Sequence, residues 1–149
     1  MIVIALRHAD RTAADALSPA GKRRAKLLAR MLGESGVSVA FRSQFKRAAD
    51  TLAPLQQKLP GLQIKEITFA DADQADDYAK RVAAAVRALP ADAVVAVIGH
   101  SNTVGPVIAQ LGGGQIAPIA ETEFDKMFVL FVAPDRPASL LKLRYGEPT

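Results

Sequence analysis

Two short, wholly apolar runs constrain the fold of this chain most, because each has the length of a strand and leads into a histidine. The run Ile2–Leu6 ends two residues before His8, and the run Val94–Ile98 ends two residues before His100. Uninterrupted apolar residues are typical of strands that are buried on both faces of a parallel sheet. The sequence therefore predicts both runs as central strands of such a sheet.

Helical patterns alternate with the strand-like runs, which is the element order of an α/β fold. Ser18 is expected to cap a helix that has Pro19 at its first position, since proline needs no N–H partner there. A second helix is expected to start at a Ser43 cap and to run towards Leu59, with a kink or an early stop at Pro54. A third is expected to follow the acidic stretch 71–77, and a fourth to follow the turn at 99–103.

Further strands are expected at Val37–Phe41, Leu62–Ile67, Lys126–Val132 and Leu140–Tyr145. Together these elements predict a single α/β domain over residues 1–149. Its three layers are a mostly parallel central sheet with helices on both faces. The length agrees, because single domains cluster near about 100–150 residues.

Composition excludes several kinds of chemistry. The chain has no cysteine, so disulfides, thiol catalysis and thiolate metal sites are excluded, and with two histidines a His-rich zinc site is not expected. No cofactor or metal is predicted. No apolar run reaches the roughly 18 residues of a membrane span, and the first is too short for a signal-peptide core. A cytoplasmic protein without a membrane partner is expected.

The charge balance is basic, with a net charge of +4 at pH 7 and an isoelectric point near 9.6. An anionic substrate, a nucleic acid and a generally basic surface are all compatible with this balance. Nucleic-acid binding is not expected, because the sequence lacks aromatic residues clustered beside basic ones and any recognisable reading motif.

Chemistry-bearing side chains follow the predicted central strands. Because ligands of open α/β sheets bind at the carboxyl ends of the strands, His8 and His100 are expected to share one site. Arg7 precedes His8, and Arg47 falls in the first turns of the second helix. Guanidinium groups bind two oxygens of a phosphate at once, and the N–H groups of residues 101–103 are expected to add to the anion site. The pattern predicts a phosphate-binding site.

Four segments resemble, in order and spacing, the histidine phosphatase superfamily, also called the phosphoglycerate mutase-like family. They are Leu6-Arg7-His8-Ala9, Leu17-Ser18-Pro19-Ala20-Gly21, Ser43-Gln44-Phe45-Lys46-Arg47-Ala48-Ala49-Asp50-Thr51 and Gly99-His100-Ser101. Each segment alone is a weak signal, whereas four in register are a strong one. Ala9 departs from the family pattern, which has glycine at this position.

The resemblance implies a role for each matching residue. His8 is expected to attack phosphorus and carry the phosphoryl group, for which its other ring nitrogen needs a backbone acceptor. Arg7 and Arg47 are expected to neutralise the phosphoryl oxygens, His100 to donate to them, and Ser101 to contribute to substrate binding. Phosphoryl transfer depends mainly on such positioning and charge stabilisation.

The general acid is not identified by the sequence. No aspartate follows His100, so the chain does not resemble the acid-phosphatase branch, in which that residue donates the proton. Asp10 is favoured because it lies near His8 in the sequence. The alternatives left open are Glu66, Asp71, Asp73, Glu121, Glu123 and Asp125.

The chain is short for this superfamily and resembles its minimal members, such as the bacterial phosphohistidine phosphatase. The resemblance implies a metal-independent phosphatase that acts on a phosphorylated small molecule or a phosphoprotein. Mutase activity is less expected, because a short chain lacks a lid to keep water from the phosphorylated enzyme. The alternative is a non-catalytic module on the same fold that binds a phosphorylated ligand. The oligomeric state is left open.

Overall fold

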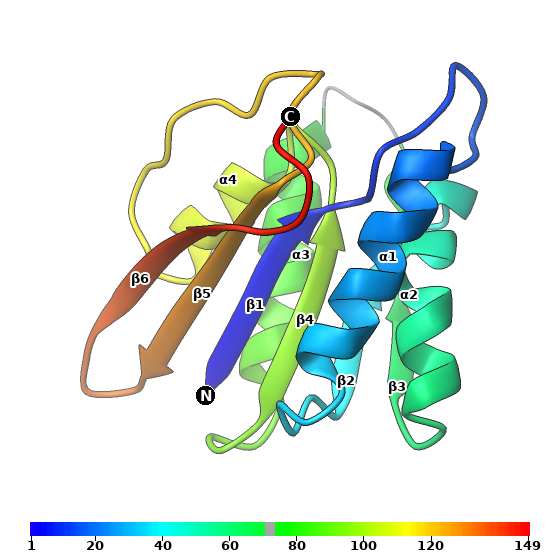
Figure 1. The fold of residues 1–149 in the computed structure, drawn as a ribbon. Coiled ribbons are helices and arrows are strands. Elements are labelled where there is room, and N and C mark those ends of the chain that lie inside the picture. Colours follow the sequence, from blue (N-terminus) through cyan, green and yellow to red (C-terminus); the bar gives the residue numbers. More distant parts are fainter. Residues whose placement is uncertain (71–73) are drawn as a thin grey trace.

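The computed structural model describes residues 1–70 and 74–149, which form an α/β fold around one six-stranded sheet (Figure 1). The strands are β1 (Ile2–Arg7), β2 (Val39–Arg42), β3 (Gln63–Glu66), β4 (Val94–Gly99), β5 (Lys126–Ala133) and β6 (Arg136–Arg144). The helices are α1 (Pro19–Leu32), α2 (Lys46–Lys58), α3 (Ala75–Arg87) and α4 (Val104–Gln110). None of these helices has both the length and the apolar composition that crossing a membrane requires.

The sheet has the order β3-β2-β4-β1-β5-β6, so the two runs that precede the histidines lie side by side at its centre. β3, β2, β4 and β1 are paired in parallel, whereas β5 and β6 add antiparallel pairs at one side. The predicted fold class, a mostly parallel sheet with helices on both faces, is confirmed.

Both faces of the central strands are buried, which explains why they are apolar at every position. Val3 and Ala5 of β1 pack with the buried side chains of α3 and α4, and Ile4 and Leu6 pack with those of α1 and α2. Figure 1 shows these two helix pairs on opposite faces of the sheet. The carboxyl ends of β1 and β4 lie together at one end of the sheet.

The start of α1 is built as the sequence predicts. The Ser18 hydroxyl oxygen accepts the N–H of Gly21 at 3.1 Å, and Pro19 occupies the first helical position. Gly21 is needed for close packing, because a Cβ at this position would lie 1.9 Å from the carbonyl oxygen of Asp10. The glycine thus lets α1 pack against the loop that follows His8.

We expect Gly21→Ala to lower the free energy of unfolding by about 1–3 kcal/mol, even though alanine favours helix by about 1 kcal/mol. The added methyl group meets a backbone atom, so the helix or the loop that carries His8 has to move. Urea denaturation measures the effect. Gly61→Ala is the matched control, since a Cβ at Gly61 meets no atom within 4 Å. Equal urea midpoints for the two variants would contradict this packing argument.

The second helix departs from the prediction at its start. α2 begins at Lys46 after Phe45, and the Ser43 hydroxyl does not cap it. Instead, Asp15, in the loop between β1 and α1, accepts the N–H groups of Lys46 and Arg47 at 2.9 and 3.0 Å. The predicted Ser43 cap is therefore wrong, because a carboxylate distant in the sequence satisfies these N–H groups.

Two further boundaries differ from the prediction. α2 runs through Pro54 to Lys58, so of the two predicted alternatives, a kink or an early stop, the early stop is wrong; buried Leu52 and Leu55 on either side of the proline keep the helix packed on the sheet and α1. β6 begins at Arg136 rather than Leu140, because an edge strand accommodates Pro137.

Candidate active site

The register of β1 and β4 brings the two histidines together. Arg7 pairs with Gly99 at the last position of the ladder, and the N–H of His8 donates to the Gly99 carbonyl at 2.9 Å. The ring centroids of His8 and His100 are 5.4 Å apart. The two imidazoles therefore converge, as predicted, at the carboxyl ends of adjacent strands.

The two rings line a pocket of about 330 Å³ together with Arg7, Arg47 and Ser101. The structure thus gathers these five predicted site residues around one cavity. Phe45, Phe69 and Glu121 also line this pocket.

The orientation of His8 suits a nucleophile. Its Nδ1–H donates to the Ala9 carbonyl at 2.8 Å, because a carbonyl can only accept, and this leaves the lone pair on Nε2. Burial lowers the pKa of His8 to about 4; the hydrogen bond to Ala9 opposes this shift, and the charges of Arg7 and Arg47 add to it. The imidazole is therefore neutral at physiological pH.

His100 is held by Ser43, which was predicted to cap the second helix. Its Nε2 lies 2.8 Å from the hydroxyl of Ser43, which is fully buried, and the Phe69 ring stacks on the imidazole. Burial lowers the pKa of His100 to about 3, and the neighbouring His8 adds to the shift. A signal for Ser43 was present, because Ser43 directly follows β2 just as the histidines follow their strands.

The low pKa values of His8 and His100 give a direct prediction, since these are the only histidines in the chain. We expect the chemical shifts of the ring C–H groups of both histidines to stay constant in NMR spectra between about pH 5.5 and 8. This range spans the ordinary histidine pKa of about 6.5. The unfolded chain takes up protons in this range while the folded chain does not, so stability falls as pH drops from 6.5 towards 4. A midpoint near 6.5 for either ring would contradict the buried, neutral site.

Arg7 is fixed by the loop that precedes β5. Its Nη1 donates to the carbonyl oxygens of Ala120, Glu121 and Glu123 at 2.8–3.0 Å, and its guanidinium lies over the Phe124 ring. Its Nη2 lies 3.3 Å from the exposed carboxylate of Glu121. The arginine is therefore rigid, with one carboxylate on the side that faces the pocket.

Arg47 has fewer protein partners. Its Nη1 donates to Asp15 at 3.0 Å, and its guanidinium lies over the Phe45 ring. Thr51, one turn further along α2, donates to the Arg47 carbonyl and accepts the N–H of Ala9 at 2.9 Å. Thr51 thus connects the helix that carries Arg47 to the turn that carries His8.

Three buried nitrogens around the pocket have no hydrogen-bond partner in the described part of the chain. They are Nε of Arg7, Nε of Arg47 and Nδ1 of His100. Buried polar groups are normally satisfied, and one left unpaired costs about 1–3 kcal/mol. Their gathering at one cavity is typical of a site for an anion.

The favoured general acid, Asp10, has a structural partner. Its carboxylate accepts Nε of Arg24 at 2.6 Å, and both side chains are buried. Arg24 also donates to the carbonyl oxygens of Tyr145 and Glu147, which joins the loop after His8 to the end of the chain. Asp10 is not among the residues that line the pocket, so its predicted catalytic role has no contact there.

Three of the other candidate acids are also paired with a basic side chain. Glu66 pairs with Arg42, Glu123 with Lys126, and Asp125 with Arg144. Asp71 and Asp73 lie outside the described residues. Glu121 is the one candidate among the described residues that lines the pocket.

The turn after His100 differs from the expected row of free N–H groups. The N–H of Thr103 donates to the His100 carbonyl, and the Thr103 hydroxyl accepts the N–H of His100. The predicted contribution of the Thr103 N–H to the anion site is therefore wrong, because the turn itself uses that donor. The Ser101 hydroxyl donates to the Glu121 carboxylate at 2.7 Å.

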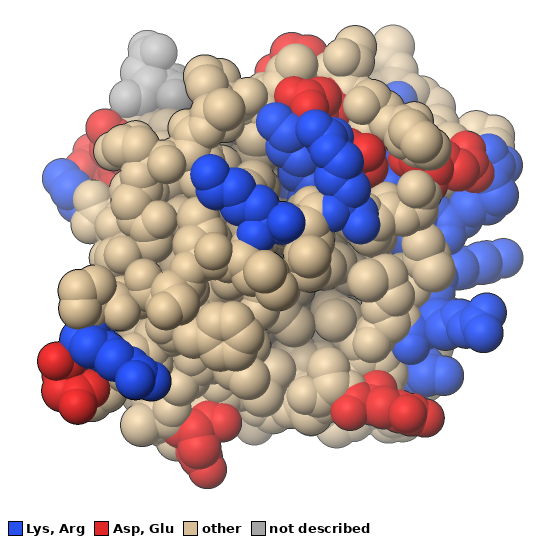
Figure 2. All heavy atoms as spheres, turned by 60° about the vertical axis from the view of Figure 1, so that its left-hand side comes forward, with Lys and Arg blue, Asp and Glu red and all other residues tan. Residues whose placement is uncertain are grey.

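Charges of both signs gather at this end of the molecule. Figure 2 shows Lys and Arg side chains beside Asp and Glu side chains at its upper end, where β1 and β4 terminate. At the pocket itself, Arg7 forms an ion pair with Glu121, and Arg47 forms one with Asp15. The cations here are individually placed and partly neutralised rather than part of a uniform basic surface.

Comparison with known proteins gives consistent likenesses. The model of the histidine phosphatase superfamily (branch 1) matches residues 6–68, which contain three of the four motifs. No curated protein matches the sequence.

Solved structures match along nearly the whole chain. The mycobacterial glucosyl-3-phosphoglycerate phosphatase has a TM-score of 0.68 at 16% identity, with 99% of each chain covered. The protein histidine phosphatase SixA complexed with tungstate has a TM-score of 0.67 at 21% identity, with 97% of each chain covered. SixA from Agrobacterium tumefaciens has a TM-score of 0.64 at 20% identity, again with 97% of each covered. At these identities the likeness is one of fold.

Proposed function

We propose that the chain, which matches the model of the histidine phosphatase superfamily (branch 1) over residues 6–68, is a phosphatase that transfers a phosphoryl group to His8 and then to water. The proposal rests mainly on the protonation and the orientation of His8. Its Nε2 is unprotonated, its ring is fixed by the Ala9 carbonyl, and two guanidiniums stand beside it. A neutral, oriented imidazole between fixed cations is what attack on a phosphoryl group requires.

The first step forms the bond between Nε2 of His8 and phosphorus and breaks the bond between phosphorus and the leaving-group oxygen, which keeps the bonding electron pair and takes a proton from water. Arg7 and Arg47 balance the charge on the phosphoryl oxygens. With the Ser43 hydroxyl donating to Nε2 of His100, the proton of His100 is on Nδ1, which has no partner among the described residues and is proposed to donate to a phosphoryl oxygen. In the second step water attacks phosphorus, the Nε2–phosphorus bond breaks, and phosphate leaves with a neutral His8.

Both classes of substrate expected from the sequence are retained in the proposal. Proteins of this fold include a glucosyl-3-phosphoglycerate phosphatase and a protein histidine phosphatase. The proposed substrate is accordingly a phosphorylated small molecule or a phosphoprotein.

The test is phosphate release from p-nitrophenyl phosphate and from a phosphohistidine-containing protein, each with an excess of chelator. Release from at least one is expected to continue in the chelator, since the residues above need no metal. Thermal stabilisation by phosphate without release from either substrate would instead support the non-catalytic binding module.

Glu121 is proposed to compete with the phosphoryl group for Arg7 rather than to act as the general acid. The hydrogen bond from Ser101 lowers the pKa of Glu121; slight burial opposes this shift, and Arg7 adds to it. A general acid has to be protonated at the start of the reaction, whereas this carboxyl is ionised.

We expect Glu121→Gln to lower KM for p-nitrophenyl phosphate by about threefold, because it removes an exposed negative charge beside Arg7. The change in kcat is expected to stay within about threefold, whereas loss of a general acid costs about 10²-fold or more. Steady-state kinetics distinguish the two outcomes. Glu34→Gln, an exposed position outside the pocket, is the control for the change in net charge. A large fall in kcat for Glu121→Gln alone would assign the acid role to this residue.

A further inference from the structure

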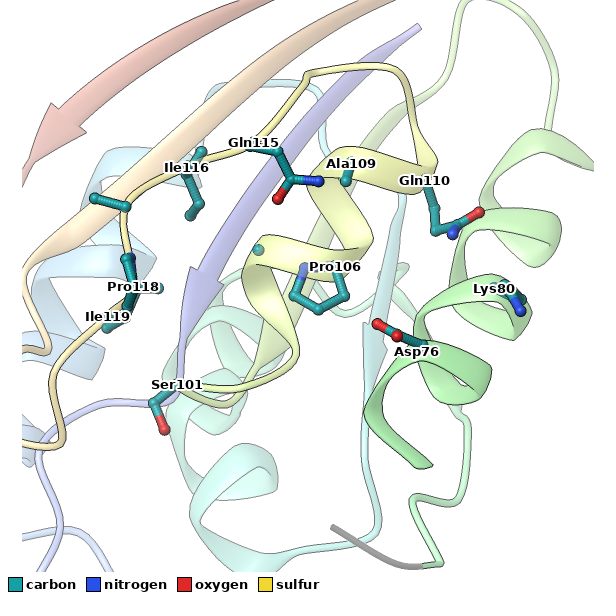
Figure 3. A pocket seen from close by; sticks show the side chains of 12 residues that line it. Asp76, Lys80, Ser101, Pro106, Ala109, Gln110, Gln115, Ile116, Pro118 and Ile119 are labelled. Carbon is teal, nitrogen blue, oxygen red and sulfur yellow. The ribbon is translucent and has the colours of Figure 1, made fainter. Parts of the chain in front are cut away.

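A second pocket of about 380 Å³ opens beside the first, between α3, α4 and the segment that leads to β5. Figure 3 shows it from close by, with Pro106 of α4 at its centre and Asp76 and Lys80 projecting from α3. Its volume lies within the range of small-molecule sites, about 300–1,000 Å³. The residues assigned above to phosphoryl transfer do not account for this cavity.

Ser101 joins the two pockets, because it lines both of them. It follows His100 directly, and its hydroxyl is bonded to Glu121, which stands beside Arg7. A phosphoryl group held at His8 therefore lies on one side of Ser101, and the second pocket lies on the other. The second pocket is therefore adjacent to any organic group that is bonded to this phosphoryl group.

The lining of the second pocket combines hydrogen-bonding groups with apolar surface. Asp76 and Lys80 supply one charge of each sign from adjacent turns of α3. Gln110 and Gln115 supply exposed carboxamides that make no hydrogen bond within the described residues. Figure 3 shows the carboxylate of Asp76 and the carboxamide of Gln115 on opposite sides of the Pro106 ring.

Such a lining favours an uncharged group that carries many hydroxyls. Carboxylate and carboxamide oxygens accept from hydroxyl groups, and ammonium and amide N–H groups donate to them. Pro106 and Ile116 offer apolar surface to the C–H face of a ring. Lys80 also lies 3.8 Å from Asp77, so this part of α3 carries no net positive charge that would favour a second anionic group.

We propose that the second pocket binds the organic part of the substrate, and that the substrate is a phosphate ester of a polyhydroxylated small molecule such as a sugar. This inference rests on the proposed phosphatase function and chooses between its two substrate classes. The phosphoryl group lies at His8, the ester oxygen lies near Ser101, and the hydroxyl-bearing ring lies against Pro106.

The test compares glucose 6-phosphate with methyl phosphate, which carries the same phosphoryl group on a minimal leaving group. We expect the wild-type protein to prefer glucose 6-phosphate in kcat/KM by tenfold or more, since about two added hydrogen bonds of about 1 kcal/mol each correspond to this factor. Ala109→Phe, which places a ring in the pocket from α4, is expected to reduce that preference at least about tenfold. Ala53→Phe, at an exposed position of α2 outside both pockets, is the matched control.

Loss of the preference in Ala109→Phe but not in Ala53→Phe supports the subsite. The inference is overturned by a wild-type protein that treats the two esters alike, by a preference that survives Ala109→Phe, or by turnover of a phosphohistidine protein alone. Gln115→Leu, which removes a hydrogen-bonding group from an exposed segment, is expected to weaken the preference about threefold and guards against misfolding of the phenylalanine variant. Absence of phosphate release from every compound would instead mean failure of the proposed phosphatase function.

Discussion

Replacing His8 with alanine is expected to lower kcat for phosphate release by at least about 10³-fold, because the phosphoryl group then has no acceptor on the protein. The other imidazole cannot take over this role, since Nε2 of His100 is engaged by Ser43 and its ring is buried under Phe69. Steady-state phosphate release measures the loss. A kcat within tenfold of the wild type would contradict covalent catalysis at His8.

A structural loss of activity has to be separated from a chemical one, because His8 is buried and removal of its side chain leaves a cavity. His8→Asn keeps a polar side chain at the site and is expected to lose activity to the same extent. Phosphate is expected to raise the thermal unfolding temperature of both variants, since Arg7 and Arg47 are intact. Loss of this stabilisation in both variants would mean that the site itself had collapsed.

Replacing either pocket arginine with alanine is expected to lower kcat/KM by about 10²–10³-fold, as for other groups that stabilise transition-state charge. The two variants are expected to differ in stability. Arg7→Ala leaves the carbonyl oxygens of Ala120, Glu121 and Glu123 without their donor and is expected to cost more than about 2 kcal/mol of unfolding free energy. Arg47 has one partly exposed partner, Asp15, so its loss is expected to cost less than about 1 kcal/mol.

Kinetics and denaturation of the same two variants test this difference between Arg7 and Arg47. Lysine at either position is expected to restore little activity, because an ammonium cannot bind two phosphoryl oxygens in the planar geometry of a guanidinium. Arg30→Ala, at an exposed position of α1, is the control for loss of a positive charge. Equal destabilisation by Arg7→Ala and Arg47→Ala would contradict the structural role of the loop before β5.

The fold and the centre of the site could be predicted because both depend on short-range patterns. The wholly apolar runs of β1 and β4 identify the central strands, and the parallel register then fixes where His8 and His100 meet. Arg47 was predictable for the same reason, since α2 follows the strand next to β4.

The rest depends on pairs of residues far apart in the sequence, which no local pattern encodes. Ser43 reads locally as a helix cap, but its hydroxyl faces His100. Asp10 reads as a free carboxyl near the nucleophile, but it binds Arg24. Glu121 reads as part of a solvated acidic loop, yet Arg7 holds it at the pocket. In each case the competing partner becomes visible only in the folded chain.

Trapping the phosphorylated enzyme during turnover tests covalent catalysis at His8 most directly. The wild-type protein is mixed with p-nitrophenyl phosphate, quenched within milliseconds in alkaline denaturant, which preserves phosphohistidine, and digested for mass spectrometry. We expect one phosphoryl group, on the peptide that contains His8, and none in His8→Asn. Phosphorylation of His100, or turnover by the wild type with an unmodified His8, would contradict this expectation.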